Sequence, residues 1–579
     1  MRFVLLCVTV LCSGILSATA AEIPSGKGKY CDTPSRCDNP MTTAGMVTTS
    51  NHLASQAALQ TLRNGGNAVD AAITAASVLA VVYPQMTTLG GDNFWLIYNA
   101  RTGELKALNA SGRSGEKASI GFYAEHGVTK KIPSRGYLAA NTVPGVVSGW
   151  DEARRYAAEA MGTRLQWKDL LAPAIAYAKN GFIVSHSLAH WSAVNVNPND
   201  QEFRDLQRFE GFRHTYLKED GSPYRAGDVL KQPELADTLG LIAEKGAEEF
   251  YRGSIAKRIV ADLEAHDGVL TLKDFADNHA DWVKPISVNY RQYRAYNFPP
   301  NTQGMASLEI LNILNNFDVA KLGEGSADYY HLLIEATKQA FADRDRYLSD
   351  PDFVKIPLDW LLSEKHGKDQ AARIRMDEAA TSVTPLDPKG DTVWLGVIDA
   401  DGNAVSLIQS IYHDFGSGIV AGGTGVLLQN RGSFFSLDPA HVNHLEPRKR
   451  TFHTLNPAML FKDGKPYLLY GTMGGEGQPQ TQAAVVTRIV DFGMSPQDAI
   501  NGPRWLYGRT WGASSNDLKL ESRVPADVVA ELKKRGHPVR VVEDYTDTMG
   551  HAGAILIDPA SGRRQGASDP RGDGAAVGY

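Results

Sequence analysis

The chain has 579 residues, of which 43% are hydrophobic and 21% are charged, an ordinary composition for a large globular protein. Its 59 Lys and Arg residues against 65 Asp and Glu residues give a formal net charge of −6. No basic block and no stripe of aromatic and basic residues stands out, so we expect no nucleic acid as a partner.

Residues 1–20 have the pattern of a signal peptide. Arg2 supplies the positive end, the stretch from Phe3 to Leu16 is apolar, and Ala18-Thr19-Ala20 resembles a cleavage site. The apolar stretch is short for a bilayer span, which needs about 20 residues. A lipoprotein would use Cys12, but Leu11 before it is bulkier than such a site usually tolerates. We therefore expect export, to the periplasm or outside the cell, without a stable membrane anchor.

Cleavage near residue 20 would remove Cys7 and Cys12 and leave Cys31 and Cys37. In an oxidising compartment such a pair most often forms a small disulfide loop. Two cysteines with no histidine nearby do not indicate a metal site. The histidines of the chain are scattered along the sequence, so the sequence predicts neither a metal nor a cofactor.

The N-terminal part after the signal peptide is predicted to be two helices and a hairpin. The helices cover His52 to Leu62 and Ala68 to Val82, and Asn67 can cap the second one. Strands are expected from Phe94 to Tyr98 and from Leu105 to Asn109. The glycine pair before the first strand lacks the pattern of a phosphate-binding loop, so a nucleotide site is rejected.

Helices dominate the sequence up to residue 390, and strands dominate just after it. Further helical regions are expected at 145–183, 228–263, 306–314 and 327–348. After residue 392 the pattern predicts a hairpin of strands 393–398 and 404–411, strands at 425–429, 457–462, 466–470 and 552–558, a helix at 479–491 and a glycine-rich tail.

Thr392 lies where these two halves meet. The run from Pro385 to Gly390 is rich in turn residues, and the run from Val393 to Ile398 is apolar and β-prone. A hydroxyl at the start of a buried strand, after a loop, suits both chain cleavage and nucleophilic attack. From this stretch alone, a structural threonine is the commoner interpretation.

Several long motifs, in the same order, resemble those of the γ-glutamyltranspeptidases, a family of N-terminal-nucleophile hydrolases. The resemblance covers essentially the whole mature chain. Its most specific runs are Leu62 to Ala72, Ala342 to Pro351, Phe415 to Ile419, Gly474-Gly475 and Gly566 to Arg571. It implies an α+β fold, a four-layer αββα sandwich. It also implies a precursor that cuts itself between Asp391 and Thr392 into a large subunit, 21–391, and a small subunit, 392–579.

The resemblance gives Thr392 a role that its chemistry supports. Its hydroxyl can attack the carbonyl of Asp391, and hydrolysis of the resulting ester frees the α-amino group of Thr392. An α-amine has a pKa of about 7.7–8.0, so it can act as general base for its own hydroxyl. Gly474 and Gly475 match the family pair whose backbone N–H groups stabilise the oxyanion.

The substrate pocket departs from the γ-glutamyl pattern. Arg113 matches the arginine that holds the substrate α-carboxylate, and Ser410 and Thr454 match pocket hydroxyls. Five residues differ from those of typical members, namely Val393, Tyr412, Arg431, Phe434 and His453. Phe434 replaces an acid that would pair with an α-ammonium, and Arg431 adds positive charge. The loop 436–449 is too short for a lid, which indicates a lid-less, acylase-like branch.

We therefore predict an exported, self-processing enzyme similar to γ-glutamyltransferases and glutathione hydrolases, which cleaves a small-molecule amide through a threonine acyl-enzyme and passes the acyl group to water or an amine. The alternative is an acylase or small-amide amidohydrolase for amine-free acyl groups, glutaryl-like or oxamate-like. A further alternative is a family member that has lost catalysis.

Overall fold

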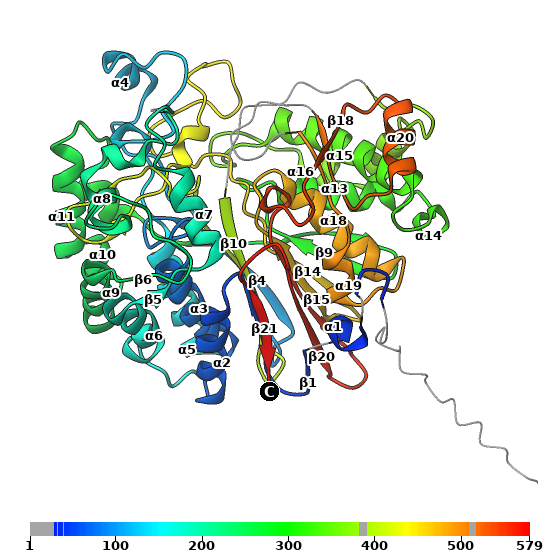
Figure 1. Cartoon of the computed structure of the whole chain (residues 1–579), viewed down its shortest axis with the longest axis horizontal. Coiled ribbons are helices and arrows are strands. Elements are labelled where there is room, and N and C mark those ends of the chain that lie inside the picture. The colour runs from blue at the N-terminus through cyan, green and yellow to red at the C-terminus, as the bar shows by residue number, and fades with distance from the viewer. Residues whose placement is uncertain (1–27, 32, 39, 201, 381–390, 509–516) are drawn as a thin grey trace, which may run out of the picture.

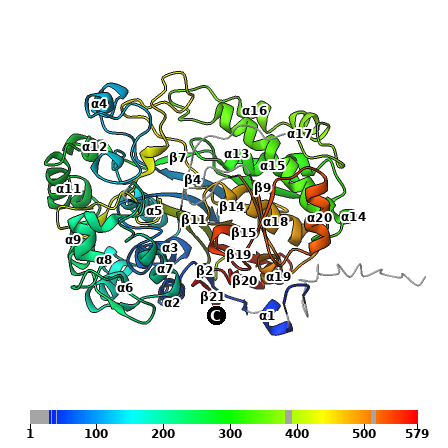
Figure 2. The ribbon, with the colours of Figure 1, turned by 45° about the horizontal axis from the view of Figure 1, so that its top comes forward.

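Two antiparallel sheets form the centre of the molecule (Figures 1 and 2). The structure, a computed structural model, describes residues 28–579 except 32, 39, 201, 381–390 and 509–516. The first sheet has seven strands in the order β21-β2-β10-β11-β3-β4-β7, and the second has seven in the order β1-β20-β19-β15-β14-β9-β8.

The strands of the first sheet are β21 (Ala575–Gly578), β2 (Met46–Thr49), β10 (Asp391–Ile398), β11 (Ala404–Tyr412), β3 (Asp92–Asn99), β4 (Glu104–Ala110) and β7 (Asp281–Val283). Those of the second are β1 (Met41–Thr42), β20 (Arg564–Ser568), β19 (Ala552–Ile557), β15 (Lys465–Thr472), β14 (Ala458–Lys462), β9 (Tyr293–Asn297) and β8 (Ile286–Tyr290). Smaller sheets are formed by β5 (Phe182–Ile183) with β6 (Val229–Leu230), β12 (Val420–Ala421) with β13 (Val426–Leu427), and β16 (Trp505–Tyr507), β17 (Leu518–Glu521) and β18 (Val539–Val542).

The two large sheets pack face to face through alternate residues of their strands. On β10, Trp394 and Ile398 belong to the apolar cluster between the sheets, together with Met459 and Ile555 of the second sheet. Leu395, which lies between them in the sequence, points outward into the helical layer. This period of two is the geometry of a strand that is buried on both faces.

Helices cover the outer face of each sheet, so the layers run αββα, and the predicted fold is confirmed (Figure 1). On the side of the first sheet the helices are α2 (His52–Arg63), α3 (Ala68–Val82), α4 (Ile120–Glu125), α5 (Val146–Ala160), α6 (Trp167–Asn180), α7 (His186–Val194), α8 (Glu210–Tyr216), α9 (Pro233–Lys245), α10 (Glu248–Tyr251), α11 (Ser254–Glu264) and α12 (Leu272–Asp277). On the side of the second they are α13 (Gly304–Leu314), α14 (Val319–Leu322), α15 (Ala327–Tyr347), α16 (Leu358–Leu361), α17 (Glu364–Ala371), α18 (Gly477–Val490), α19 (Pro496–Asn501) and α20 (Ala526–Lys534).

Most predicted elements are present with shifted ends, and α3 has the predicted bounds. Asn67 caps α3 as expected, because its side chain accepts hydrogen bonds from the N–H groups of Val69 and Asp70. The predicted strand after the cleavage point, 393–398, is present as β10, which begins two residues earlier, at Asp391, where it pairs with Tyr412. The predicted turn from Pro385 to Gly390 lies outside the described residues.

The sequence analysis missed strands β2, β8 and β9 and gave no structure to the tail, which forms β20 and β21. β21 is poor in β-branched residues and is a strand because it pairs with β2, more than 500 residues earlier in the chain. The C-terminus therefore closes the edge of the first sheet (Figure 2).

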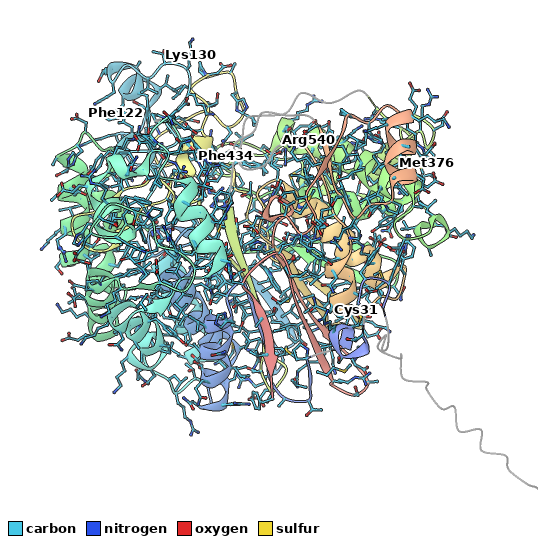
Figure 3. All side chains as sticks on the ribbon, in the orientation of Figure 1. Cys31, Phe122, Lys130, Met376, Phe434 and Arg540 are labelled. Atoms are coloured by element: carbon cyan, nitrogen blue, oxygen red, sulfur yellow. A yellow bond between two sulfur atoms is a disulfide. The ribbon has the colours of Figure 1, made fainter. Side chains whose placement is uncertain are left out.

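Cys31 and Cys37 form a disulfide with Cα atoms 5.6 Å apart, at the short helix α1 (Pro34–Asp38) (Figure 3). Residues 1–20, the predicted signal peptide, lie outside the described residues. Within the described part of the chain, no helix is both long enough and apolar enough to cross a membrane.

Candidate active site

Thr392 is the second residue of β10 and is fully buried. Because side chains alternate along a strand, Thr392 shares with Trp394 the face that looks toward the second sheet. The Nε2 atom of Gln478, at the start of α18, donates a hydrogen bond to Thr392 Oγ at 3.4 Å. The hydroxyl therefore lies where groups from both sheets and from α18 converge.

The register of β10 with β11 places the predicted pocket residues beside Thr392. Asp391 pairs with Tyr412 and Val393 pairs with Gln409, so the ladder is irregular at Thr392 and leaves it opposite Ser410 and its neighbour. Tyr412 has a φ of +82°, which is uncommon for a residue with a side chain. Such backbone strain is often found at functional sites.

Gly474 and Gly475 lie between the end of β15 and the start of α18, with φ values of +115° and +53°. The Nε2 atom of Gln303 donates to the carbonyl oxygens of both Gly475 and Thr454, each at 2.9 Å. Among the described residues, none accepts a hydrogen bond from the N–H of Gly474 or Gly475. These two donors are therefore available to a developing oxyanion.

A chain of amide side chains connects Thr392 with the other predicted residues. Asn456 Nδ2 donates to Gln478 Oε1 at 3.1 Å and to the carbonyl oxygen of Thr454 at 2.9 Å. Neither Gln478 nor Asn456 was predicted. For Gln478 the available signal was the run of polar residues after the glycine pair, which belongs to the buried helix α18.

Arg431 is the charged centre of the pocket. It is 1% exposed, and its two terminal nitrogens donate to Thr454 Oγ1 and Ser410 Oγ, each at 3.3 Å. Its Nε is buried and has no hydrogen-bond partner among the described residues. Burial lowers the pKa of Arg431 to about 10, against the opposing effects of Tyr412 and Asp92. The guanidinium nevertheless stays cationic at neutral pH.

Aromatic rings stack against this cation. The guanidinium carbon of Arg431 lies 4.3 Å from the centre of the Tyr412 ring. The Phe434 ring stacks on the Tyr412 ring, with the two ring centres 4.5 Å apart. Figure 3 labels Phe434 near the N-terminal end of β10. Phe434 also lines a cavity of about 250 Å³ with Arg344, Phe452 and Glu476, the residue after Gly475. Among the pocket residues predicted from the sequence, Phe434 is one that lines this cavity.

His453 is buried, and its Nε2 lies 3.2 Å from Asp92 Oδ2. Burial, and next the charge of Arg431, lowers the pKa of His453 well below its ordinary range, so the imidazole is neutral. Burial raises the pKa of Asp92 to about 6, although the N–H groups of Gly112 and Gly145 and the Gln429 amide donate to it. Asp92 was missed because its glycine-rich context was assessed only as a phosphate loop.

Arg113 lies apart from this hydrogen-bonded group. Its guanidinium forms ion pairs with Asp350 at 3.3 Å and with Asp352 at 2.8 Å. It lines a cavity of about 560 Å³ together with Arg252, Arg448 and other residues. The structure thus brings Thr392, Ser410, Tyr412, Arg431, Phe434, His453, Thr454, Gly474 and Gly475 into one contact network. Arg113 lies outside this network and forms ion pairs with other carboxylates.

Comparisons with known proteins agree with the resemblance. The family model for γ-glutamyltranspeptidase matches residues 54–579. The chain is 48% identical to a glutathione hydrolase-like proenzyme, YwrD, of Bacillus subtilis, over 93% of this chain and 98% of that protein. It is 44% identical to an oxamate amidohydrolase proenzyme of Klebsiella pneumoniae, over 93% and 99%. The crystal structure of a cephalosporin acylase from Bacillus halodurans superposes with a TM-score of 0.85 at 37% identity, covering 93% of this chain and 96% of that one.

Proposed function

Because the chain belongs to the γ-glutamyltranspeptidase family, we propose that Thr392 is its nucleophile and that its acyl substrate carries a carboxylate but no ammonium group. The chain is a hydrolase and acyltransferase of the N-terminal-threonine type.

Release of Thr392 is an internal acyl shift. The Thr392 hydroxyl adds to the carbonyl carbon of Asp391, the C–N bond breaks, and the acyl group passes to Oγ as an ester. Water then hydrolyses the ester and frees the amine. The relatives' designation as proenzymes supports this step. The products are a large subunit, 21–391 after loss of the signal peptide 1–20, and a small subunit, 392–579.

The same atoms then serve turnover. The free α-amine of Thr392 takes the hydroxyl proton, Oγ attacks the substrate amide, and the proton passes to the leaving amine. The N–H groups of Gly474 and Gly475 stabilise the oxyanion, and one such donor contributes about 3–4 kcal/mol. Gln478, which already donates to Thr392 Oγ, positions the hydroxyl. Water or an acceptor amine completes the cycle.

The substrate proposal rests on the surroundings of Arg431. Among the described residues no carboxylate forms an ion pair with it, and its terminal nitrogens donate only to hydroxyl groups. A desolvated cation without an anionic partner is unfavourable, and a substrate carboxylate can supply that partner through two charge-assisted hydrogen bonds. Phe434, which stacks on Tyr412, offers nothing to an ammonium group except its ring face.

One of the named relatives supports the amine-free substrate. Oxamate has a carboxylate next to its amide and no amine, and the chain is 44% identical to an oxamate amidohydrolase. A second candidate function is hydrolysis of γ-glutamyl amides such as glutathione. It is favoured by the 48% identity to a glutathione hydrolase-like protein, and Asp92, near Arg431, could pair with an α-ammonium.

A matched pair of substrates separates the two candidates. Glutaryl and γ-glutamyl p-nitroanilides differ only by the α-ammonium group, and an oxalyl anilide tests the shorter oxamate-like acyl group. We expect kcat/KM for the better amine-free substrate to exceed that for γ-glutamyl by at least tenfold. A γ-glutamyl anilide that is turned over as fast as both others would contradict the substrate proposal and leave Thr392 chemistry intact.

A further inference from the structure

Three helices on the outer face of the second sheet meet at a buried group of two carboxyls and an imidazole. Glu309 lies on α13, Asp343 on α15 and His366 on α17, and Figure 2 shows these helices grouped together. One ligand atom from each residue lies within 4.8 Å of the other two. The three residues are 2%, 9% and 6% exposed, respectively.

Glu309 is unusual because nothing in the described part of the chain satisfies its carboxyl. No described residue donates a hydrogen bond to it, and its Oε1 is buried without a partner. Its neighbours along α13 are apolar, and an apolar side chain would avoid the cost of burying an unbonded carboxyl. The group it faces is Asp343, a second acid. Two such carboxyls need a proton or a cation between them.

The other two side chains are held in place by their surroundings. His366 Nε2 lies 2.8 Å from Asp343 Oδ2, and Gln370 Nε2 donates to the same oxygen at 2.6 Å. The ring of Trp360 packs 4.1 Å from the imidazole of His366. Polar and aromatic groups that orient ligands in this way are typical of metal sites in proteins.

We propose that Glu309, Asp343 and His366 bind a zinc ion. The double positive charge would offset both carboxylates, and two carboxylates with an imidazole are a donor set that zinc takes readily. Zinc bonds of about 2.0–2.1 Å place neighbouring ligand atoms about 3.3 Å apart. His366 Nε2 and Asp343 Oδ2 are 2.8 Å apart, and all three ligand atoms lie within 4.8 Å of one another, so the spacing is of the size that a zinc site requires.

Two other groups in the described residues have metal-ligand atoms at similar spacing, but each is already satisfied. In the first, the group of His331, Glu335 and His537, Glu335 pairs with the Lys338 ammonium at 2.7 Å. In the second, Cys31 and Cys37 are joined in a disulfide beside Asp498, which accepts hydrogen bonds from backbone N–H groups. The Glu309 group differs from both because the Glu309 carboxyl accepts no hydrogen bond from any described residue.

The proposed ion would be structural and would act next to the candidate active site. α13 begins directly after Gln303, whose amide holds the carbonyl of Gly475. Arg344, the residue after Asp343, donates to Gln303 Oε1 at 3.1 Å. A metal that joins α13, α15 and α17 would therefore fix the helices that position the glycine pair.

Zinc binding to the full-length protein tests this proposal. The protein is stripped with a chelator, dialysed and titrated with zinc chloride, with metal content measured by mass spectrometry and melting temperature by fluorimetry. We expect one zinc per chain, a higher melting temperature with zinc, and at least a tenfold loss of affinity in Glu309→Gln and in His366→Gln. The control is His214→Gln, which removes a surface histidine 2.9 Å from Glu234. It should leave the zinc stoichiometry, the zinc affinity and the zinc-induced rise in melting temperature unchanged.

The chelated Glu309→Gln protein provides a second readout. Since a neutral amide replaces an unsatisfied acid, this variant should melt no lower than chelated wild type while losing the zinc-induced shift. If it does not fold, His366→Gln and an anomalous-scattering peak at the zinc edge in wild-type crystals decide the matter. Zinc stoichiometry unchanged in the variants, no zinc in wild type, or preferential binding of calcium would overturn the proposal.

Discussion

Arg431 and Tyr412 together determine the chemistry of the pocket at the scale of single residues. The Tyr412 ring stacks on the guanidinium, and Ser410 and Thr454 accept its hydrogen bonds. None of these contacts neutralises the charge, so the site is prepared for an anion. The resemblance predicted all four positions as pocket residues. It could not show that they surround one cation.

Replacement of Arg431 by glutamine should reduce kcat/KM for a glutaryl or oxalyl anilide by about 10- to 100-fold, because a charge-assisted hydrogen bond contributes about 1.5–3 kcal/mol. The melting temperature should change little, since no carboxylate of the described residues forms an ion pair with Arg431, whose terminal nitrogens donate to hydroxyl groups. Steady-state kinetics and calorimetry on the processed enzyme measure both effects.

Arg113→Gln is the matched comparison, because the family resemblance assigns the substrate carboxylate to Arg113. Arg113 already pairs with Asp350 and Asp352, so we expect the smaller loss in this variant. A large loss in Arg113→Gln together with a small one in Arg431→Gln would place the carboxylate at Arg113 and contradict the pocket described above.

Asp92 should give substrate binding a pH dependence. Its pKa is about 6, so it ionises as the pH rises through that value and offsets part of the field of Arg431, while buried His453 stays neutral. KM for an anionic substrate should therefore rise above pH 6 in wild type, and Asp92→Asn should flatten that rise. A KM profile with the same inflection in both proteins would exclude Asp92 as its cause.

The same group affects folding with a defined sign. The folded pKa of about 6 is above the ordinary value of 3.8, so the native state holds this proton more tightly than the unfolded state does. Its contribution to stability is fully present below about pH 4 and is lost as the pH rises through about 6. Denaturant unfolding at pH 5 and pH 7.5 in wild type and Asp92→Asn measures it.

At the scale of elements, local signals predicted helices better than strands. The cap at Asn67 and the apolar composition of the following segment defined α3, and the Asp401-Gly402 turn defined the β10–β11 hairpin, where Gly402 has a φ of +87°. β2 and β21 could not be predicted in the same way, because their pairing depends on segments more than 500 residues apart. Gln478 was missed because its role depends on a tertiary contact, the hydrogen bond to Thr392.

The packing of β10 against β15 makes a stability prediction. A Cβ atom added at Gly471 would lie 2.2 Å from Cδ1 of Trp394, so the sheets would have to separate or the ring would have to move. Gly471→Ala should destabilise the fold by about 1–3 kcal/mol, as overpacked cores do. The control is Gly240→Ala in α9, where nothing lies within 4 Å, and it should be neutral or stabilising. Equal melting temperatures for the two variants would show that this inter-sheet contact is not tight.

At the scale of the whole molecule, the candidate site lies where the two sheets, the loop before α18 and the pocket aromatics meet. Thr392 belongs to the first sheet, whereas Gly474, Gly475 and Gln478 follow β15 of the second. A cut before Thr392 would therefore leave the two subunits intertwined, since β10 and β11 of the small subunit pair with β2 and β3 of the large one. The products of cleavage should remain one particle.

Self-cleavage at Thr392 is the central claim, and the mass and N-terminal sequence of the purified protein test it most directly. Wild type should resolve under denaturing conditions into two chains, the smaller beginning at Thr392, and should elute as a single complex under native conditions. Thr392→Ala should remain one uncut chain. A wild-type protein that stays intact, or a Thr392→Ala protein that is cut at the same bond, would contradict the account.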